Sequence, residues 1–357
     1  MSSTTVHPGG HPPSPAASAI AAPSRRPPLL SGPLRQRLLA FACLVLGLCS
    51  VGPLLAWVYG LGQFALWFWA LTVPGLLFIA ALAMVLRRTG AHPDLHAAIV
   101  AGVLGGIAGT VAYDVVRLPF LAMGLRLFAP IDSYGLLILN VSHSSPLTEF
   151  TGWAYNFANG AGFGVAYAML FLGRRWLWAI PWALWLETMT IVTPYAASYG
   201  LAGHADLIAI AYGAHVAFAT PLGLIVRDAA GWRRQEDAPV PAWWAVAGVA
   251  VVLLAVQQPW SAPSGLAAAE ALRPQPASLV ESGKFVPEWA RIPQGGCLLL
   301  VNRDAAGYTL SGFGKSRQLA GHSQARYCFA SAGVNRVQLN GVPYSGGFVI
   351  ADPALHP

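Results

Sequence analysis

Apolar stretches long enough to cross a lipid bilayer constrain this chain more than any other feature. A membrane-spanning helix needs about 20 predominantly apolar residues, because each residue advances the helix by about 1.5 Å. Seven stretches meet this length, at residues 38–59, 64–86, 95–116, 150–173, 176–198, 207–226 and 241–259. The composition agrees, since 55% of the residues are hydrophobic and only 10% are charged, against roughly 25% charged in soluble domains. We therefore predict a mainly α-helical fold, with a seven-transmembrane-helix bundle over residues 35–260.

The distribution of arginine predicts the orientation of this bundle. Loops on the cytoplasmic side of a membrane are enriched in Lys and Arg. If the N-terminus is cytoplasmic, the inner side receives every arginine pair before residue 260: Arg25, Arg26, Arg35, Arg37, Arg87, Arg88, Arg174, Arg175, Arg227, Arg233 and Arg234. Only Arg117 and Arg126 fall outside. We expect residues 1–34 to be a disordered cytoplasmic tail, and we attribute the net charge of +7 to membrane topology and not to nucleic-acid binding.

Two further features concern the packing of the predicted helices. Residues 118–148 are apolar but interrupted by Pro119, Arg126, Pro130 and Asp132, which favours an interfacial helix or a re-entrant pair, chiefly at 118–140, over a full span. Glycines at GxxxG spacing occur in the third and fourth stretches, at Gly102, Gly105, Gly106, Gly109, Gly160 and Gly164. Because such glycines let two backbones approach closely, we predict that these helices pack together.

The stretch Glu149–Arg175 combines a membrane-spanning length with a polar face. At helical spacing, one side of it carries Glu149, Trp153, Asn156, Asn159, Gly160, Phe163, Gly164 and Tyr167. An amide without a hydrogen-bond partner in hydrocarbon costs several kcal/mol. This face must therefore point towards protein or water and not towards lipid.

Ionisable groups on four of the predicted helices form the candidate site, since such groups are costly in a membrane and are functional by default. One set lies about 9–16 Å below the outer membrane edge and can meet in the outer half of the bundle: Glu187, His215, Asn156 and Asn159. A second set lies nearer that edge and would form a polar vestibule: Asp114, Arg117, Glu149 and, as the weakest candidate, His204.

These side chains also have structural interpretations. Asp114 and Arg117 are three residues apart and can pair on one helix, and the two asparagines of the 150–173 stretch can join helices by hydrogen bonds. Glu187 is hardest to explain in this way, because a carboxylate near mid-membrane needs a cation, a proton or a hydrogen-bond partner. It is either protonated, or paired with His215, or it binds a transition metal together with His215.

The character of the chain changes after residue 260. Residues 261–276 are predicted to be a linker, and residues 277–357 contain short alternating runs separated by glycine turns, which predict β-strands. Seven spans after a cytoplasmic N-terminus place this domain outside, in the periplasm or extracellular space. Cys297 and Cys328 can form a disulfide there, whereas Cys43 and Cys49 lie in an apolar stretch and are expected to be inert.

This β region, over about residues 277–352, resembles the cupredoxin family. The first half of the pattern is found in Phe285-Val286-Pro287, Ile292-Pro293-Gln294-Gly295 and Leu300-Val301-Asn302-Arg303-Asp304. The second half is found in Leu319-Ala320-Gly321, Phe329, Ala332-Gly333 and the run from Gly346 to Ile350. The resemblance implies a small β-sandwich.

The copper ligands that the family would require are missing. The position of the first ligand histidine is Tyr308, the position of the ligand cysteine is Leu339, and residues 340–347 contain neither His nor Met. Because blue copper needs a thiolate and two imidazoles, we expect no copper in this domain. Its implied role is to dock a partner or to cover the outer mouth of the bundle.

Three classes of function remain open. The pocket could bind or transport a proton, a small cation or a polar solute, although no inverted repeat supports a secondary transporter. Glu187 and His215, with Asp114 or His204, could instead hold a metal that activates water, although no HExxH spacing is present. Alternatively, the chain is an accessory subunit of a respiratory or metal-handling membrane complex, since membrane helices followed by a copper-free cupredoxin-like domain are similar to the second subunits of some respiratory oxidases. The expected partners are lipid and another membrane subunit, and no nucleotide-binding loop is present.

Overall fold

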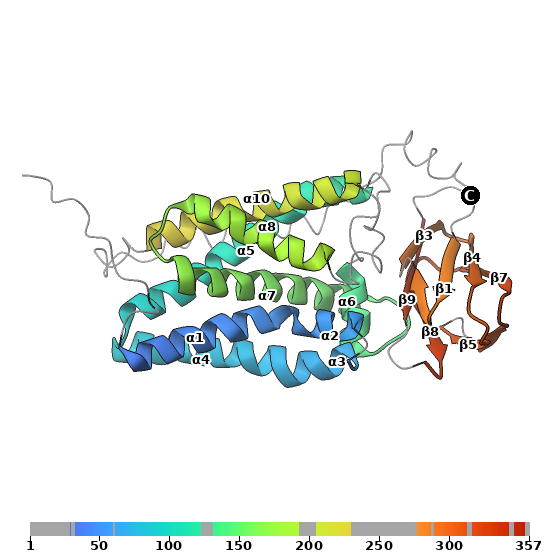
Figure 1. Ribbon diagram of the computed structural model, residues 1–357, viewed down its shortest axis with the longest axis horizontal. Helices are drawn as coiled ribbons and strands as arrows, with labels where there is room; N and C mark the ends of the chain where they lie inside the picture. Colours follow the sequence, from blue (N-terminus) through green and yellow to red (C-terminus); the bar gives the residue numbers. More distant parts are fainter. Residues whose placement is uncertain are drawn as a thin grey trace, which may run out of the picture.

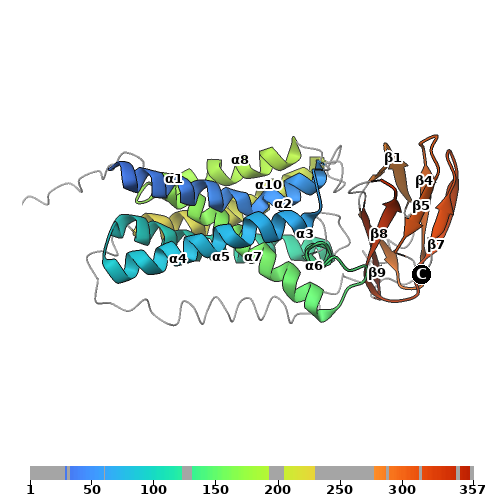
Figure 2. The same ribbon diagram turned by 90° about the horizontal axis from the view of Figure 1, so that it is seen from below.

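The computed structural model describes residue 29 and residues 33–59, 61–122, 131–192, 205–229, 277–286, 289–312, 316–342 and 346–353. The predicted tail, the seventh predicted span at 241–259, His204 and the linker at 261–276 lie outside these residues, except for Leu29, Pro33 and Leu34. Long helices lie side by side in one part of the molecule, and a β domain adjoins one end of them (Figures 1 and 2).

The helical part begins with two interrupted helices. The first consists of α1 (Leu34–Leu48), the 3₁₀ turn η2 (Cys49–Val51) and α2 (Gly52–Val58). The second consists of α3 (Phe64–Trp67), the π turn η3 (Phe68–Thr72) and α4 (Val73–Thr89). Each irregular turn precedes a proline, Pro53 or Pro74, which has no N–H to continue the helical hydrogen bonding. Thr72 Oγ1 donates to the carbonyl of Cys49 at 3.3 Å, so the two irregular turns contact each other.

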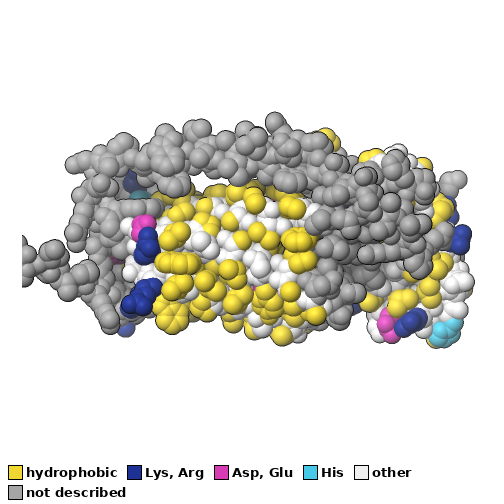
Figure 3. Space-filling view, turned by 90° about the horizontal axis from the view of Figure 1, so that it is seen from above, with side chains coloured by type: hydrophobic (Ala, Val, Ile, Leu, Met, Phe, Trp, Pro, Cys, Tyr) yellow, Lys and Arg dark blue, Asp and Glu magenta, His cyan; other side chains and the backbone are white. Residues whose placement is uncertain are grey.

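Five further helices follow in the described part of the chain. α5 spans Pro93–Ala122, the short α6 spans Ile131–Leu139, and α7 spans Pro146–Phe171. The 3₁₀ turn η4 (Trp176–Trp178) leads into α8 (Ala179–Ile191), and α10 spans Ala205–Ala229. The arginines of α1, α4, the α7–η4 connection and α10 all lie at the end of the bundle away from the β domain (Figures 1 and 3).

The predicted packing of the glycine-rich helices is confirmed. A Cβ on Gly102 or Gly106 would collide with the α7 backbone around Gly164 and Gly160. The other two glycines of α5 face a different helix, because a Cβ on Gly105 or Gly109 would meet Leu222 or Phe218 of α10. Glycines therefore let α5 approach two helices at backbone contact distance.

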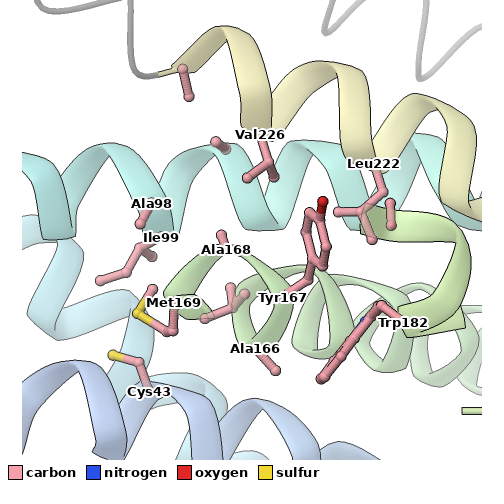
Figure 4. Packing of buried hydrophobic residues seen from close by; sticks show 14 of the residues in the cluster. Cys43, Ala98, Ile99, Ala166, Tyr167, Ala168, Met169, Trp182, Leu222 and Val226 are labelled. Atoms are coloured by element: carbon pink, nitrogen blue, oxygen red, sulfur yellow. The ribbon is translucent and has the colours of Figure 1, made fainter. Parts of the chain in front are cut away.

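A hydrophobic core joins the helices on the side of the bundle away from the β domain. Tyr167 and Met169 of α7 are fully buried there. Tyr167 lies near Trp182 of α8 and Leu222 of α10, whereas Met169 lies between Ile99 of α5 and Cys43 of α1 (Figure 4). The outer faces of the helices are also apolar (Figure 3), and their exposed large side chains include Leu66, Trp69, Leu77, Phe78 and Trp185. A bundle that is apolar inside and outside is typical of a protein surrounded by lipid.

The number of spans differs from the prediction. Within the described residues, four helices are long and apolar enough to cross a membrane: 34–57, 64–89, 93–120 and 208–229. The fourth predicted stretch, 150–173, is helical as part of α7, but it is not among these four, and its polar and glycine positions lower its hydropathy. The described part of α8 has 13 residues. The count of seven stays a prediction.

The segment between the third and fourth predicted spans contains α6. This helix has nine residues, too few to cross a bilayer. Most of its side chains are buried, including Leu136 and Ile138, and it packs against α7 at the end of the bundle that faces the β domain (Figure 2). Gly135 and Gly152 make this packing close, because a Cβ on either would collide with a carbonyl of the other helix.

The described β domain consists of two sheets. The first contains β1 (Ala277–Glu281), β2 (Lys284–Val286), β4 (Cys297–Asn302) and β7 (Gln324–Cys328), in the order β2-β1-β4-β7. The second contains β3 (Trp289–Pro293), β5 (Tyr308–Ser311), β6 (Arg317–Leu319), β8 (Gly333–Asn340) and β9 (Gly347–Asp352), in the order β3-β9-β8-β5-β6. Inward-facing residues alternate along the strands, as in β4 with Leu298 and Leu300, and fill the core between the sheets.

A disulfide joins two neighbouring strands of the first sheet. Cys297 begins β4 and lies opposite Cys328, the last residue of β7. The structure records a disulfide between them. Cys43 is a buried free cysteine in α1, and Cys49 is a half-buried one in η2.

Candidate functional site

Asp114, Arg117 and Asn156 form a buried hydrogen-bonded group between α5 and α7. Arg117 donates to Asp114 Oδ1 from Nη2 at 2.8 Å and from Nε at 3.2 Å. Asn156 Nδ2 donates to the other carboxylate oxygen, Oδ2, at 2.9 Å. The side chains of Asp114 and Arg117 are each only 3% exposed. The charge of each is therefore balanced by the other, and both carboxylate oxygens are hydrogen-bonded.

A second polar group joins α8 to α10. Glu187 is 1% exposed, and its Oε2 lies 3.3 Å from Nδ1 of His215. Thr190 donates to the same carboxylate oxygen at 3.1 Å, and His215 Nδ1 also lies 2.9 Å from the carbonyl of Ala211. The second carboxylate oxygen, Glu187 Oε1, is buried and has no hydrogen-bond partner in the described part of the chain. This carboxylate is thus incompletely satisfied, in contrast to that of Asp114.

Tyr113 lies between the two groups. The guanidinium of Arg117 lies 5.4 Å from the centre of the Tyr113 ring, within the range of a cation–π contact. The Tyr113 ring also contacts that of His215, with 5.1 Å between ring centres and an interplanar angle of 75°. Polar and aromatic contacts therefore run without interruption from Asn156 on α7, through α5 and α10, to Glu187 on α8.

The structure separates residues that the sequence predicted to lie together. Asn159 does not approach Glu187, because its Oδ1 accepts a hydrogen bond from Ser50 at 2.8 Å, which joins α7 to the first helix. Asp114 and Arg117 are buried with Asn156 and do not form an open vestibule. Glu149 is exposed in the first turn of α7. His204 lies outside the described residues.

Several polar partners were missed by the sequence analysis. Ser50 lies in the apolar stretch 38–59, yet its hydroxyl donates to Asn159 Oδ1 and its carbonyl accepts from Tyr155 at 3.1 Å. Thr188 and Tyr212 form a second polar contact between α8 and α10, with 3.0 Å between their hydroxyl oxygens. A hydroxyl group in an apolar stretch carries no signal of which helix it will contact. Neither the Ser50–Asn159 pair nor the Thr188–Tyr212 pair could therefore have been assigned from the sequence.

The start of α7 was predicted four residues too late. The helix begins at Pro146, and Ser145 caps it, since Ser145 Oγ accepts from the backbone N–H of Thr148 at 3.3 Å. Ser145 N–H in turn donates to Thr148 Oγ1 at 2.8 Å. The signal was present in the sequence, because Ser followed by Pro is a common start of a helix.

Metal-binding donors are sparse in the described residues. The described ranges contain no group of three or more His, Cys, Asp or Glu side chains that could hold a metal ion. In the β domain, the hydroxyl of Tyr308 donates to Asp304 at 2.7 Å, and Leu339 is buried in the hydrophobic core. Cys297 and Cys328 are bonded to each other. These side chains do not fit a blue-copper centre, which requires a thiolate and two imidazoles.

Comparison with solved structures relates the β domain to cupredoxins. A reduced Cu(I) form of an amicyanin variant is 18% identical and covers 24% of this chain and 89% of its own, with a TM-score of 0.21. The purple cupredoxin from Nitrosopumilus maritimus is 17% identical and covers 22% of this chain and 100% of its own, with a TM-score of 0.19. No protein-family model matches the chain, and no curated protein matches it.

These observations define the class of the protein. Its long apolar helices indicate a membrane protein. A C-terminal β domain of two sheets follows these helices in the chain.

Proposed function

We propose that the helical domain binds and releases a proton, or a small hard cation, at the Glu187–His215 pair. The single observation that carries this proposal is Glu187 Oε1, a buried carboxylate oxygen without a hydrogen-bond partner in the described residues. A carboxylate in such surroundings gains free energy by taking up a proton or a cation. The neighbouring imidazole of His215 is a suitable group to exchange that proton.

The contrast with Asp114 supports assigning the role to Glu187. The carboxylate of Asp114 receives hydrogen bonds on both oxygens and is neutralised by Arg117. Such a group has no unsatisfied acceptor and is best explained as a structural link between α5 and α7. Within the described residues Glu187 pairs with neither arginine nor lysine, and His215 is the titratable side chain that pairs with it across the α8–α10 contact.

We further propose that the protein lies in the membrane with its N-terminus cytoplasmic and its β domain outside. The helix ends that lie away from the β domain in Figure 1 belong to elements that carry arginines near those ends: Arg35, Arg37, Arg87, Arg88, Arg174, Arg175 and Arg227. Arginine at one end of a membrane bundle favours the cytoplasmic side for that end. In this orientation Glu187 belongs to the outer half of the bundle, since α8 runs towards the β domain and ends at Ile191 (Figure 1).

Infrared difference spectroscopy tests the proton site directly. The full chain, reconstituted in nanodiscs, is titrated from acid to alkaline pH, and the carbonyl band of protonated carboxylic acids is recorded. We expect one component of this band, separate from that of the exposed carboxyl groups, to titrate in the wild type, to be lost in Glu187→Gln and to move to another pH in His215→Asn. Glu149→Gln is the matched control, because Glu149 is exposed. If Glu187→Gln keeps the whole titrating band, the proposal is wrong.

Proteoliposomes then distinguish binding from transport. A pH-sensitive dye enclosed in the vesicles reports proton flux when a pH gradient or an added Na⁺ or K⁺ gradient is applied. Flux that depends on both Glu187 and His215 would indicate transport, and a titrating carboxyl without flux would indicate a binding or sensing role. Metal analysis of the same preparation covers the alternative of a metal-dependent enzyme, for which a stoichiometric metal should be lost in Glu187→Gln.

A second candidate function is that of an accessory subunit in a membrane complex. The feature that favours it is the β domain, because the sequence resemblance to cupredoxins places Tyr308 and Leu339 where that family has copper ligands. A sandwich without that centre is suited to docking another membrane subunit. Under this interpretation Glu187→Gln and His215→Asn leave proton uptake and flux unchanged, whereas deletion of residues 277–357 abolishes co-purification with a membrane partner.

A further inference from the structure

The loop between α6 and α7 joins the β domain by strand addition. β8 bonds β9 along residues 333–337, but it bonds β5 only along residues 338–340. Residues 142–144 occupy the edge of β8 that β5 leaves open. Arg336 N–H donates to the carbonyl of Ser142 at 2.9 Å, and Ser144 N–H donates to the carbonyl of Val334 at 3.0 Å.

Side chains reinforce this strand addition. His143 lies opposite Asn335, with 3.0 Å between His143 Nδ1 and Asn335 Oδ1. The backbone N–H of Val334 donates to Ser144 Oγ at 2.9 Å. Arg336 Nη1 donates to Asn140 Oδ1, at the end of α6, at 3.0 Å. The loop is therefore bound by main-chain and side-chain hydrogen bonds along its whole length.

An apolar contact lies beside these hydrogen bonds. Phe348 of β9 packs against Trp57 of α2, with 6.1 Å between the ring centres. Phe348 and Val334 are buried in one cluster with Ile131 and Tyr134 of α6. The β domain thus shares a small hydrophobic core with the helical domain, which distinguishes this contact from a loose tether.

The bound loop continues directly into the cap of α7. Ser144 makes the last contact with β8, and the next residue, Ser145, is the N-cap of the helix. Because these two residues are consecutive, no flexible segment separates the loop from the helix and takes up a movement of the loop. Thr148, which completes the capping box, also lies against Gly135 of α6. Moving the loop away from β8 must therefore strain or break the first turn of α7.

We propose that docking of the β domain and the first turns of α7 form one cooperative unit, which connects the outer domain to the buried Asp114–Asn156 contact. Asn156 lies eleven residues after Ser145 on the same helix, a distance of about 16 Å. A protein that binds the β sandwich and pulls it from the helices would loosen this contact without touching it. The proposal does not depend on proton binding by Glu187.

Hydrogen exchange of the full chain in nanodiscs tests this coupling. Asn335→Ala removes the partner of His143 from the β domain and touches no residue of α7. We expect amides of residues 142–144 and of the first turns of α7 to exchange faster together, by about fivefold, the change that corresponds to the loss of one helix cap. His143→Ala removes the same contact from the loop side and leaves the β sandwich unchanged. It should give the same result, and it therefore tests the coupling even if Asn335→Ala destabilises the sandwich itself.

A control and a locked variant complete the test. Asn340→Ala changes an exposed asparagine at the far end of β8 and should leave both regions unchanged. The main chains of His143 and Asn335 do not bond to each other, because the main-chain hydrogen bonds join the residues on either side of them. The Cα atoms of such a pair are typically about 4.5 Å apart, so His143→Cys with Asn335→Cys can form a disulfide. This lock should restore slow exchange in α7. Faster exchange confined to residues 142–144, with α7 unchanged, would overturn the coupling.

Discussion

Replacing Asp114 by Asn tests whether the buried ion pair is a main support of the α5–α7 contact. The substitution keeps the volume of the side chain and therefore creates no cavity. It removes the negative charge that faces Arg117, whose side chain is 3% exposed. Breaking a buried pair by removing one partner costs about 3–5 kcal/mol, because the other charge stays buried and unpaired. We expect the free energy of unfolding of Asp114→Asn to fall by this amount.

The assay is reversible unfolding in mixed micelles with increasing SDS, followed by tryptophan fluorescence. Glu149→Gln serves as the control, since it removes an exposed carboxylate and should change stability by less than about 0.5 kcal/mol. Asp114→Leu with Arg117→Met removes both charges and should recover most of the loss, because an apolar replacement of a buried pair is often nearly neutral. Asn156→Leu should cost about 1.5–3 kcal/mol, the usual contribution of one hydrogen bond to a charged group.

One result would refute this reasoning. If Asp114→Asn and Glu149→Gln lower stability equally, the guanidinium of Arg117 must find compensation elsewhere. The pair would then have no special energetic role, and the α5–α7 contact would rest on its glycines alone.

Three further predictions concern the disulfide, the β1–β2 turn and the helix crossing. Cys297→Ala with Cys328→Ala opens a loop with a sequence separation of 31, so the β domain should lose about 3–4 kcal/mol and be digested faster by protease. The Tyr308 hydroxyl and two N–H groups of the β1–β2 turn hold the pKa of Asp304 below its usual range. This contribution to stability is present above the ordinary carboxyl pKa and is lost as pH falls through the lowered pKa, so Tyr308→Phe should shift acid unfolding to higher pH. Gly164→Val places a side chain against a carbonyl of α5. It should lower the free energy of unfolding by about 1–3 kcal/mol, seen as a lower SDS midpoint.

Each of these changes has a matched control. Cys49→Ala removes a free cysteine and should leave protease resistance unchanged. Tyr327→Phe alters another tyrosine of the same domain that does not bind Asp304, and the pH of acid unfolding should stay as in the wild type. Gly213→Ala adds a methyl group that meets no atom of the other described elements within 4 Å, so it should not destabilise the bundle. A control that behaves like its paired variant contradicts the corresponding explanation.

Much of the architecture could be predicted from the sequence because it depends on local patterns. The apolar stretches at 38–59 and 64–86 both became helices, and alternating runs such as Cys297–Asn302 became strands. The contact between α5 and α7 followed from glycine spacing, since only glycine allows such close backbones. The helix begins at Pro146, before the apolar stretch 150–173, because Ser145 and Pro146 form a cap that hydropathy does not mark.

The pairing of polar side chains could be predicted only in part. Asp114 and Arg117 lie on one helix at a spacing that brings their side chains together, so their contact was available from sequence. Asn156 and Asn159 lie on nearly the same face of α7, yet one contacts α5 and the other contacts Ser50 of the first helix. The rotation of α7 between its two neighbours decides this division, and no local pattern encodes it.

The sequence by itself determined an apolar helical protein followed by a β domain, because length, hydropathy and alternation act within single segments. Only the tertiary structure decided that Glu187 and His215 face each other and that residues 142–144 complete the edge of β8. Both contacts join segments that are distant along the chain. Their formation depends on how whole helices and sheets pack, and packing sums many weak contacts that no short stretch of sequence contains.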